Sequence, residues 1–229
     1  MKYYSLQNSA NKKILGKHDP YKKVIHTVSV NDSIHLGKHF LGLVNYVPEI
    51  PILELKSEAK ILDLMIGPSA IGFTNKLIVS SKLKEILKEN NVNDIQFFEI
   101  NLIQNNKNIE GYSVMHPIKE NLDSIDFNNS EIFISSSIQP IEKVNIKSVL
   151  HFKQLREELQ TNGYNGRSIA FLFIEKLILK KEIERNLIYL NHLRNYGPFL
   201  VSEKLKNEIE KNNCTGIEFL PLGVLKQDI

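Results

Sequence analysis

Two aspartates and a nearby serine are the residues in this sequence whose types and spacing best suit chemistry. Asp123 and Asp126 lie three positions apart, and Ser130 follows shortly after them. Carboxylates this close in sequence can act as a general acid and base, or can hold a cation together. The same pattern is more common in an Asx turn or a helix cap, where the carboxylate accepts backbone N–H groups. A small hydrolase that uses Asp123 and Asp126 is therefore the alternative function, and both residues are also candidates for binding a partner.

Histidines offer a second possible site. His35 and His39 are four residues apart, so on a helix both imidazoles could reach one metal ion, with His26 or His18 as a further ligand. However, Gly37 lies between them, and the glutamate of an H-E-x-x-H motif is missing. We interpret these histidines as scattered surface residues and predict no metal site.

Other reactive motifs are weak or missing. Cys214 is the one cysteine, so no internal disulfide can form, and a free cysteine is usually a small, inert core residue. The segment 67–72 contains two glycines but lacks the spacing and the lysine of a phosphate-binding loop. No GxSxG, paired CxxC or kinase motif occurs. The sequence therefore predicts neither catalytic residues nor a cofactor, and it indicates that the protein is not an enzyme.

Charge and hydropathy narrow the range of partners. The net charge is +3, but residues 1–30 carry six lysines against one aspartate, which leaves the rest of the chain at −2. Elsewhere Lys and Glu alternate, as on solvated helix faces. A basic stripe with interleaved aromatic residues is missing, and so is the apolar run of roughly 18–20 residues that a membrane helix needs. We expect no nucleic-acid or membrane partner. The single cysteine and the lack of an apolar signal segment predict a reducing, cytoplasmic location.

The elements that must position these residues alternate between strands and short helices. Residues 77–79 form a predicted strand, after which Ser80 or Ser81 caps a helix that ends at Asn90 and Asn91. Residues 95–103 return as a strand. A second helix is predicted over 148–160, with Leu150, Leu155 and Leu159 facing inward. The pattern in 175–195 fits a helix or two strands equally well, and 12–23 and 161–167 are predicted loops. Further strands are predicted at 3–7, 24–30, 41–47, 61–66, 112–115, 131–135 and 169–174.

An internal repeat links the two clearest parts of the chain. Residues 77–100 align with 199–222 at an offset of 122 without a gap, and nine of the 24 pairs are identical. In this alignment Cys214 matches Val92, which favours a core role for the thiol. Glu208 replaces Ile86, which predicts a narrower apolar face for the helix in the second repeat unit, 199–222. The identical residues fall at the helix cap, the inward helix positions, the helix end and the returning strand. They are Val79/Val201, Ser80/Ser202, Lys82/Lys204, Leu83/Leu205, Lys84/Lys206, Asn90/Asn212, Asn91/Asn213, Ile95/Ile217 and Phe97/Phe219.

The repeat predicts an α+β fold with two similar strand–helix–strand units within mixed, mainly antiparallel sheets. We expect residues 1–229 to form a single globular protein. Within it, 1–60 is an N-terminal segment outside the repeat, and 61–229 is a body containing the repeat units 77–100 and 199–222.

The repeat segments LIVSSKLKEILKENNVNDIQFFEI and FLVSEKLKNEIEKNNCTGIEFLPL, with LDSIDFNNSEIFI between them, resemble immunity proteins of bacterial polymorphic-toxin systems. The resemblance is to the classes of immunity protein 43 and immunity protein 11 and spans about Leu62 to Leu222. It implies a cytoplasmic protein, made beside a toxin, that binds the toxin and neutralises it by occlusion. It supplies no catalytic residues and no cofactor.

The charge pattern suggests what such a toxin looks like. Inhibitors of basic clefts often imitate an acidic substrate, because complementary potentials speed association. The chain contains no acidic run longer than two residues, so we predict a toxin contact surface that is not strongly basic. Folding can nevertheless gather scattered acids into one patch, and the alternative of an acidic surface stays open. The candidate acids are Asp123, Asp126, Glu131, Glu182 and Glu184.

Overall fold

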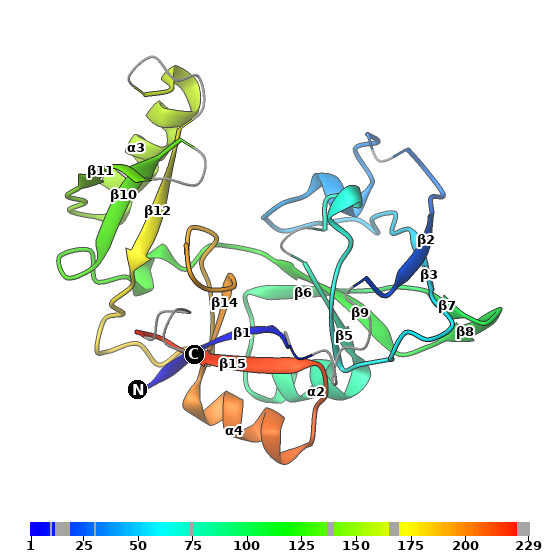
Figure 1. Cartoon of the computed structure of the whole chain (residues 1–229). Helices are drawn as coiled ribbons and strands as arrows, with labels where there is room; N and C mark the ends of the chain where they lie inside the picture. The colour runs from blue at the N-terminus through cyan, green and yellow to red at the C-terminus, as the bar shows by residue number, and fades with distance from the viewer. Residues whose placement is uncertain are drawn as a thin grey trace.

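A computed structural model shows how the predicted elements are arranged (Figure 1). Within the described residues the chain forms fifteen strands in four sheets, with three α-helices and three short 3-10 helices. Pairings between these strands are antiparallel except that of β3 with β7. This is the predicted α+β class. No helix in the described ranges has the length and apolar character needed to cross a membrane. The structure describes residues 1–9, 11, 19–29, 31–73, 76–136, 140–164 and 170–223.

The first sheet has the strand order β4-β5-β9-β6 and carries helix α2 (Ser81–Glu89) directly after β5. Ser80 caps this helix, because its side chain accepts the backbone N–H of Leu83. The helix buries Leu83, Ile86 and Leu87 on one face. The four strands are β4 (Leu64–Ile66), β5 (Leu77–Ser80), β6 (Ile95–Glu99) and β9 (Tyr112–Pro117).

The second sheet has the order β13-β14-β1-β15 and carries helix α4 (Glu203–Lys211) directly after β14. Ser202 caps α4 by accepting the backbone N–H of Leu205. This helix buries Leu205 and Ile209 but no third residue, which confirms the narrower apolar face predicted from Glu208. The four strands are β1 (Tyr3–Asn8), β13 (Leu187–Tyr189), β14 (Phe199–Ser202) and β15 (Ile217–Pro221).

These two sheets have corresponding elements. The bounds of β14, α4 and β15 are those of β5, α2 and β6 shifted by 122 residues. In each sheet another strand lies between the first and last strands of the unit and runs antiparallel to both: β9 in the first sheet and β1 in the second. Helices α2 and α4 are neighbours along the lower edge of Figure 1. Superposition of the two segments as one repeated unit stays a prediction.

Two smaller sheets complete the fold. The sheet of order β2-β3-β7-β8 lies at the right in Figure 1, and the sheet of order β11-β10-β12 stands with helix α3 (Val149–Asn162) at the upper left. The strands of the former are β2 (Tyr21–Ile25), β3 (Ile52–Leu55), β7 (Leu102–Gln104) and β8 (Lys107–Ile109). Those of the latter are β10 (Glu131–Ser135), β11 (Pro140–Val144) and β12 (Phe171–Lys176). The 3-10 helices are η1 (Leu36–Lys38), η2 (Ser69–Ile71) and η3 (Leu122–Ser124).

Several local predictions were wrong. The strand expected over 24–30 is β2, which begins at Tyr21 inside the predicted loop. Residues 41–47 form no strand. The strand expected over 95–103 is divided into β6 and β7, because the two parts belong to different sheets. Lys12, Lys13, Lys17, Asn165 and Gly166, which belong to the predicted loops 12–23 and 161–167, lie outside the described residues.

Helix α3 shows a second kind of error. Leu159 is buried and Leu155 is partly buried, but Leu150 is 64% exposed. The side of the helix that packs on the core consists of Phe152, Leu155 and Leu159, at relative positions i, i+3 and i+7. Leu150 precedes Phe152 by two residues and so lies about 200° around the helix from it.

The core joins the two larger sheets. One hydrophobic cluster contains Leu83 and Leu87 from α2 together with Leu205 and Ile209 from α4, and all four are buried as predicted. Cys214 packs against this same cluster. Leu6 of β1 belongs to this cluster too, and β1 lies between β14 and β15, so it forms part of this core although its residues come from the segment 1–60.

Candidate functional site

The two candidate aspartates have separate partners. Asp123, on η3, accepts a hydrogen bond from Arg185 Nη2 at 2.9 Å. Asp126 accepts the backbone N–H of Asn128 and the side-chain amide of Asn129, so it forms an Asx turn. Ser130 bonds instead to the backbone of residue 178. The structure therefore does not bring the three side chains into one catalytic group.

The charge states of the aspartates also differ from those of an acid–base pair. Burial raises the pKa of Asp123, but the hydrogen bond and charge of Arg185 outweigh burial and hold this pKa below its usual value. The hydrogen bond from the Asn129 side chain lowers the pKa of Asp126. A general acid needs a pKa near the working pH. Both groups are instead stable carboxylate anions, which suits binding better than proton transfer.

Asp123 lines a groove of about 700 Å³ between the loop that follows α2 and the segment before β13. We call it the acidic groove; it consists of residues 90–94, 119, 123 and 182–187. Its two cations are paired, with Lys119 Nζ 3.0 Å from Asp94 Oδ1 and Arg185 bound to Asp123.

Two further acids give the acidic groove its negative charge. Glu182 and Glu184 have exposed side chains, and no hydrogen bond or ion pair holds either one in the part of the chain that the structure describes. The lining therefore has four carboxylates against two cations. Scattered acids do gather on folding, as the alternative from the sequence allowed. Asp126 and Glu131 are not part of this lining.

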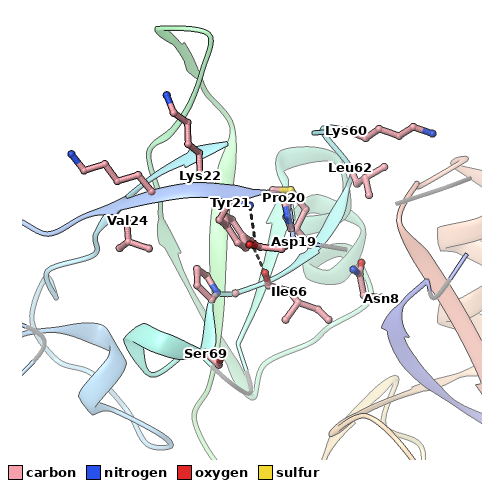
Figure 2. Close-up of a pocket in the computed structure, with 14 residues that line it drawn as sticks. Asn8, Asp19, Pro20, Tyr21, Lys22, Val24, Lys60, Leu62, Ile66 and Ser69 are labelled. Carbon is pink, nitrogen blue, oxygen red and sulfur yellow. Dashed lines mark hydrogen bonds between the residues drawn. The ribbon is translucent and has the colours of Figure 1, made fainter. Parts of the chain in front are cut away.

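Another pocket, of about 500 Å³, lies where β2 meets β4 (Figure 2). Leu62 and Ile66 contribute to its apolar wall, and Lys22 lies at its edge. The polar groups nearest the wall bond within the fold: the Tyr21 hydroxyl donates to the Ile66 carbonyl oxygen, and Lys22 pairs with Glu54 at 2.6 Å. The lining also includes Asn8, Lys60 and Ser69, so polar groups accompany the apolar wall of this recess.

A third feature is an exposed apolar segment between β2 and β3. Of ten large hydrophobic side chains that are exposed in the described ranges, six lie in residues 34–47, which we call the apolar loop. Leu43 is 60% exposed and Val47 93%. Such concentration on one segment marks interaction sites more often than scattered exposure does. The six are Ile34, Phe40, Leu41, Leu43, Tyr46 and Val47.

Side chains from the first sheet hold the backbone of the apolar loop. His116 on β9 is fully buried, and its Nε2–H donates to the Gly42 carbonyl oxygen at 2.7 Å. The Gly42 N–H donates to the carbonyl oxygen of Pro117 at 3.2 Å. Gln96 on β6 accepts from the Val44 N–H at 2.9 Å and donates to the Val44 carbonyl at 3.0 Å. The loop is thus fixed at its centre although it contains no strand.

A buried lysine fixes the start of the same loop. Lys76 is only 2% exposed, and its Nζ donates to the His39 carbonyl oxygen at 2.6 Å. The ammonium also lies 5.8 Å from the centre of the Phe73 ring. Burial lowers the pKa of Lys76 to about 8. Burying a cation costs free energy unless the cation has partners. The Lys76 ammonium is therefore expected to stay bound to the loop backbone.

The histidines that were considered as metal ligands form hydrogen bonds within the loop. His35 Nδ1 accepts the N–H of Gly37, and His39 Nε2 lies 2.8 Å from the Ser33 carbonyl oxygen. Among the described residues no group of three or more His, Cys, Asp or Glu side chains gathers as metal ligands would. His18 lies outside the described residues.

The thiol of Cys214 is likewise a packing group. Burial raises its pKa to about 11, so the thiol stays protonated near neutral pH. The thiolate is the nucleophilic form of cysteine. Cys214 is only partly buried against the cluster to which the buried Val92 belongs, so it packs at the margin of the core and not in the equivalent core position that the alignment predicted.

A strand was predicted in place of the apolar loop, because apolar residues between turn-forming residues are also typical of a strand. Pro48 and Pro51 close the segment and Gly42 lies inside it, where φ is +118°. Proline and a glycine with positive φ are poorly suited to a central strand. These residues were the signal in the sequence that argued against a strand here.

Comparison with known proteins gives a family for nearly the whole chain. Residues 3–224 match the model of a family described as Immunity protein family (Imm11). A search of curated proteins finds no match.

Proposed function

Because the chain belongs to the immunity protein family Imm11, we propose that it neutralises a cognate toxin by binding the toxin and occluding its active site or substrate channel. The match over residues 3–224 is the observation that carries this proposal. We place its action in the cytoplasm of the bacterial cell that makes the toxin, as the resemblance implies.

The geometry supports a binding role. Tight protein inhibitors depend on a few aromatic or Arg anchor residues, and the apolar loop exposes Phe40 and Tyr46. Binding is weakened when a loop must first become ordered. Here Lys76 and His116 already hold the loop backbone. The protein therefore presents an apolar surface at low entropic cost.

Co-expression with the product of the adjacent toxin gene tests the proposal. The toxin alone should stop growth of a bacterial host, and toxin with this chain should permit growth. A toxin that remains lethal beside well-expressed chain would overturn the proposal.

Titration separates an inhibitor from an enzyme. With purified proteins, toxin activity should fall linearly and reach its minimum near one equivalent of this chain, because each inhibitor molecule occludes one toxin. A hydrolase using Asp123 and Asp126 would inactivate the toxin at far lower ratios and progressively with time. Time-dependent inactivation that is lost in Asp126→Asn would therefore replace occlusion with the alternative function.

A further inference from the structure

We propose that the apolar loop, residues 34–47, is the surface that contacts the toxin, and that the toxin meets it with an apolar recess bordered by basic side chains. This inference rests on the proposed function and names the contact surface and the chemistry of the partner. It takes up the alternative of an acidic surface on this chain, in place of the prediction that the toxin surface is not strongly basic.

The first argument is the concentration of exposed apolar side chains. Outside the apolar loop, the large hydrophobic residues exposed in the described ranges are dispersed over the chain. Inside it, two aromatic and four aliphatic side chains share fourteen residues, and Lys38 is the only Lys, Arg, Asp or Glu. An interface core is similarly depleted of charge and rich in aromatic side chains. The part of the toxin that covers this loop should therefore be apolar.

The second argument is the way the loop is built. A loop with no binding role can keep its apolar side chains inward and its backbone in water. Here the arrangement is reversed at Gly42 and His39, whose carbonyl oxygens bond to the buried side chains of His116 and Lys76. The backbone faces the body while Phe40, Leu41 and Leu43 are exposed. This fixes the backbone that carries the apolar side chains before binding, which favours affinity.

The third argument is continuity with the acidic groove. The Gly42 N–H bonds to Pro117, and the next residue, Ile118, donates its N–H to the Asp94 carbonyl oxygen at 2.8 Å. Asp94 lines the groove and pairs with Lys119. Gly42 is therefore linked through residues 117 and 118 to the Asp94 end of the charged groove, and an interface core is typically surrounded by such a polar rim. Unpaired Glu182 and Glu184 make this rim negative, and a basic border on the partner would complement it.

The same charge argues against a second copy of this chain as the occupant. A two-fold dimer uses one patch on both subunits. Loop-to-loop contact would bring two acidic grooves toward each other, and like charges facing one another oppose association. A toxin surface with a basic rim has no such penalty.

Matched substitutions test the inference. Leu43→Asp places a charge in the apolar loop, and Leu150→Asp makes the same change on α3, where the leucine is 64% exposed against 60% for Leu43. We expect Leu43→Asp to raise the Kd for the purified toxin about 30-fold or more, and Leu150→Asp to leave it within about threefold. Val47→Asp provides a second loop variant at a side chain that is 93% exposed, so its fold is not at risk.

The rim is tested by association kinetics. The double variant Glu182→Gln/Glu184→Gln should associate more slowly than wild type at low salt, and its rate should depend less on salt. The control is Glu157→Gln/Glu158→Gln, which removes two adjacent exposed acids from α3. Equal rates for both double variants would overturn the basic border on the toxin.

Three outcomes are distinguishable. If wild-type chain neither binds nor protects, the proposed function fails and this inference falls with it. If wild type protects and both loop variants bind the toxin as tightly as Leu150→Asp does, only the inference is overturned. If wild type is a dimer that Leu43→Asp makes monomeric without weakening toxin binding, the loop is a contact between copies and the inference is again overturned.

Discussion

Ser80 and Ser202, which are 122 residues apart in sequence, make the same set of hydrogen bonds. Each hydroxyl oxygen accepts the backbone N–H three residues ahead and caps a helix. Each hydroxyl also donates to a side-chain oxygen just before the neighbouring strand, on Asp63 at 2.6 Å and on Asn186 at 2.9 Å. The backbone N–H of the serine also donates to the carbonyl oxygen of the same partner, Asp63 or Asn186, at 2.9 Å in both cases. A carboxylate and an amide thus take equivalent positions in the two sheets.

The first prediction concerns these caps. Ser80→Ala and Ser202→Ala should each lower the free energy of unfolding by about 1 kcal/mol, because each leaves a first-turn N–H without its acceptor. Urea unfolding followed by circular dichroism measures the change. Ser57→Ala, in an exposed turn, is the control and should be neutral. A large loss at one cap and none at the other would show that the two units are not equivalent.

The second prediction concerns the shared core. Leu83→Ala and Leu205→Ala should each cost about 2–5 kcal/mol, because both side chains are fully buried in the cluster that joins α2 and α4. The comparison is Leu150→Ala, which removes the same atoms from an exposed position and should cost within about 0.5 kcal/mol. Equal small losses at all three sites would contradict the assignment of the core.

These predictions rest on the part of the fold that the sequence specifies well. Around Ser80 and Ser202, cap, inward positions and helix end lie within ten residues of one another, so local pattern determines the structure. The structure matches the predicted caps and helices there within about two residues, whereas the returning strand predicted over 95–103 is divided.

The apolar loop shows why other parts were mispredicted. Its conformation depends on His116 and Gln96, which lie more than fifty residues away in sequence. Hydrogen bonds between residues so far apart leave no local periodicity in the sequence, so an apolar segment was interpreted as a strand. Of the acids in the acidic groove, Asp123 and Glu184 were among those that folding was expected to be able to gather, but Asp94 was not, because these residues meet only through the fold.

The third prediction concerns acid sensitivity. Burial lowers the pKa of His116 to about 4; the bond to Gly42 opposes this, and the nearby charges of Lys76 and His39 add to it. In the unfolded chain the imidazole is protonated below about pH 6.5. Between pH 6.5 and about 4 the unfolded state therefore binds a proton that the fold does not, and stability falls as the pH falls through this window.

Urea midpoints at pH 7, 5.5 and 4.5 measure this dependence. His116→Gln keeps a side-chain donor for Gly42 but cannot titrate, so its midpoint should fall less over the same range. Parallel pH profiles for wild type and variant would assign the acid sensitivity to other groups.

The fourth prediction concerns alkaline pH. Burial lowers the pKa of Lys76 to about 8, while the unfolded lysine titrates near 10.4. Between these values the unfolded state holds more protons, so this group makes the fold more stable as the pH rises. Lys76→Met should lack this contribution. The buried tyrosines and Cys214 contribute equally to both proteins. The difference in unfolding free energy between wild type and variant, measured from pH 7.5 to 9.5, therefore gives the contribution of the lysine alone.

The same variant tests the link between Lys76 and the apolar loop. Without a donor for the His39 carbonyl, backbone amides in residues 34–47 should exchange hydrogen faster than in wild type, while those of α4 should not change. Unchanged exchange in the loop would show that the buried lysine does not hold it.

The position of β1 between β14 and β15 affects when the protein can fold during synthesis. Strands β4, β5, β6 and β9 all lie within residues 64–117, so the first sheet can form while the rest of the chain is still being made. Strand β1 is translated early, yet its partners end at Pro221. At ribosomal speeds the wait is roughly 10 to 40 s, during which the edges of β1 are unpaired. Under the proposed function, a cell that makes the toxin and this chain together therefore gains protection only after residue 221 has been translated.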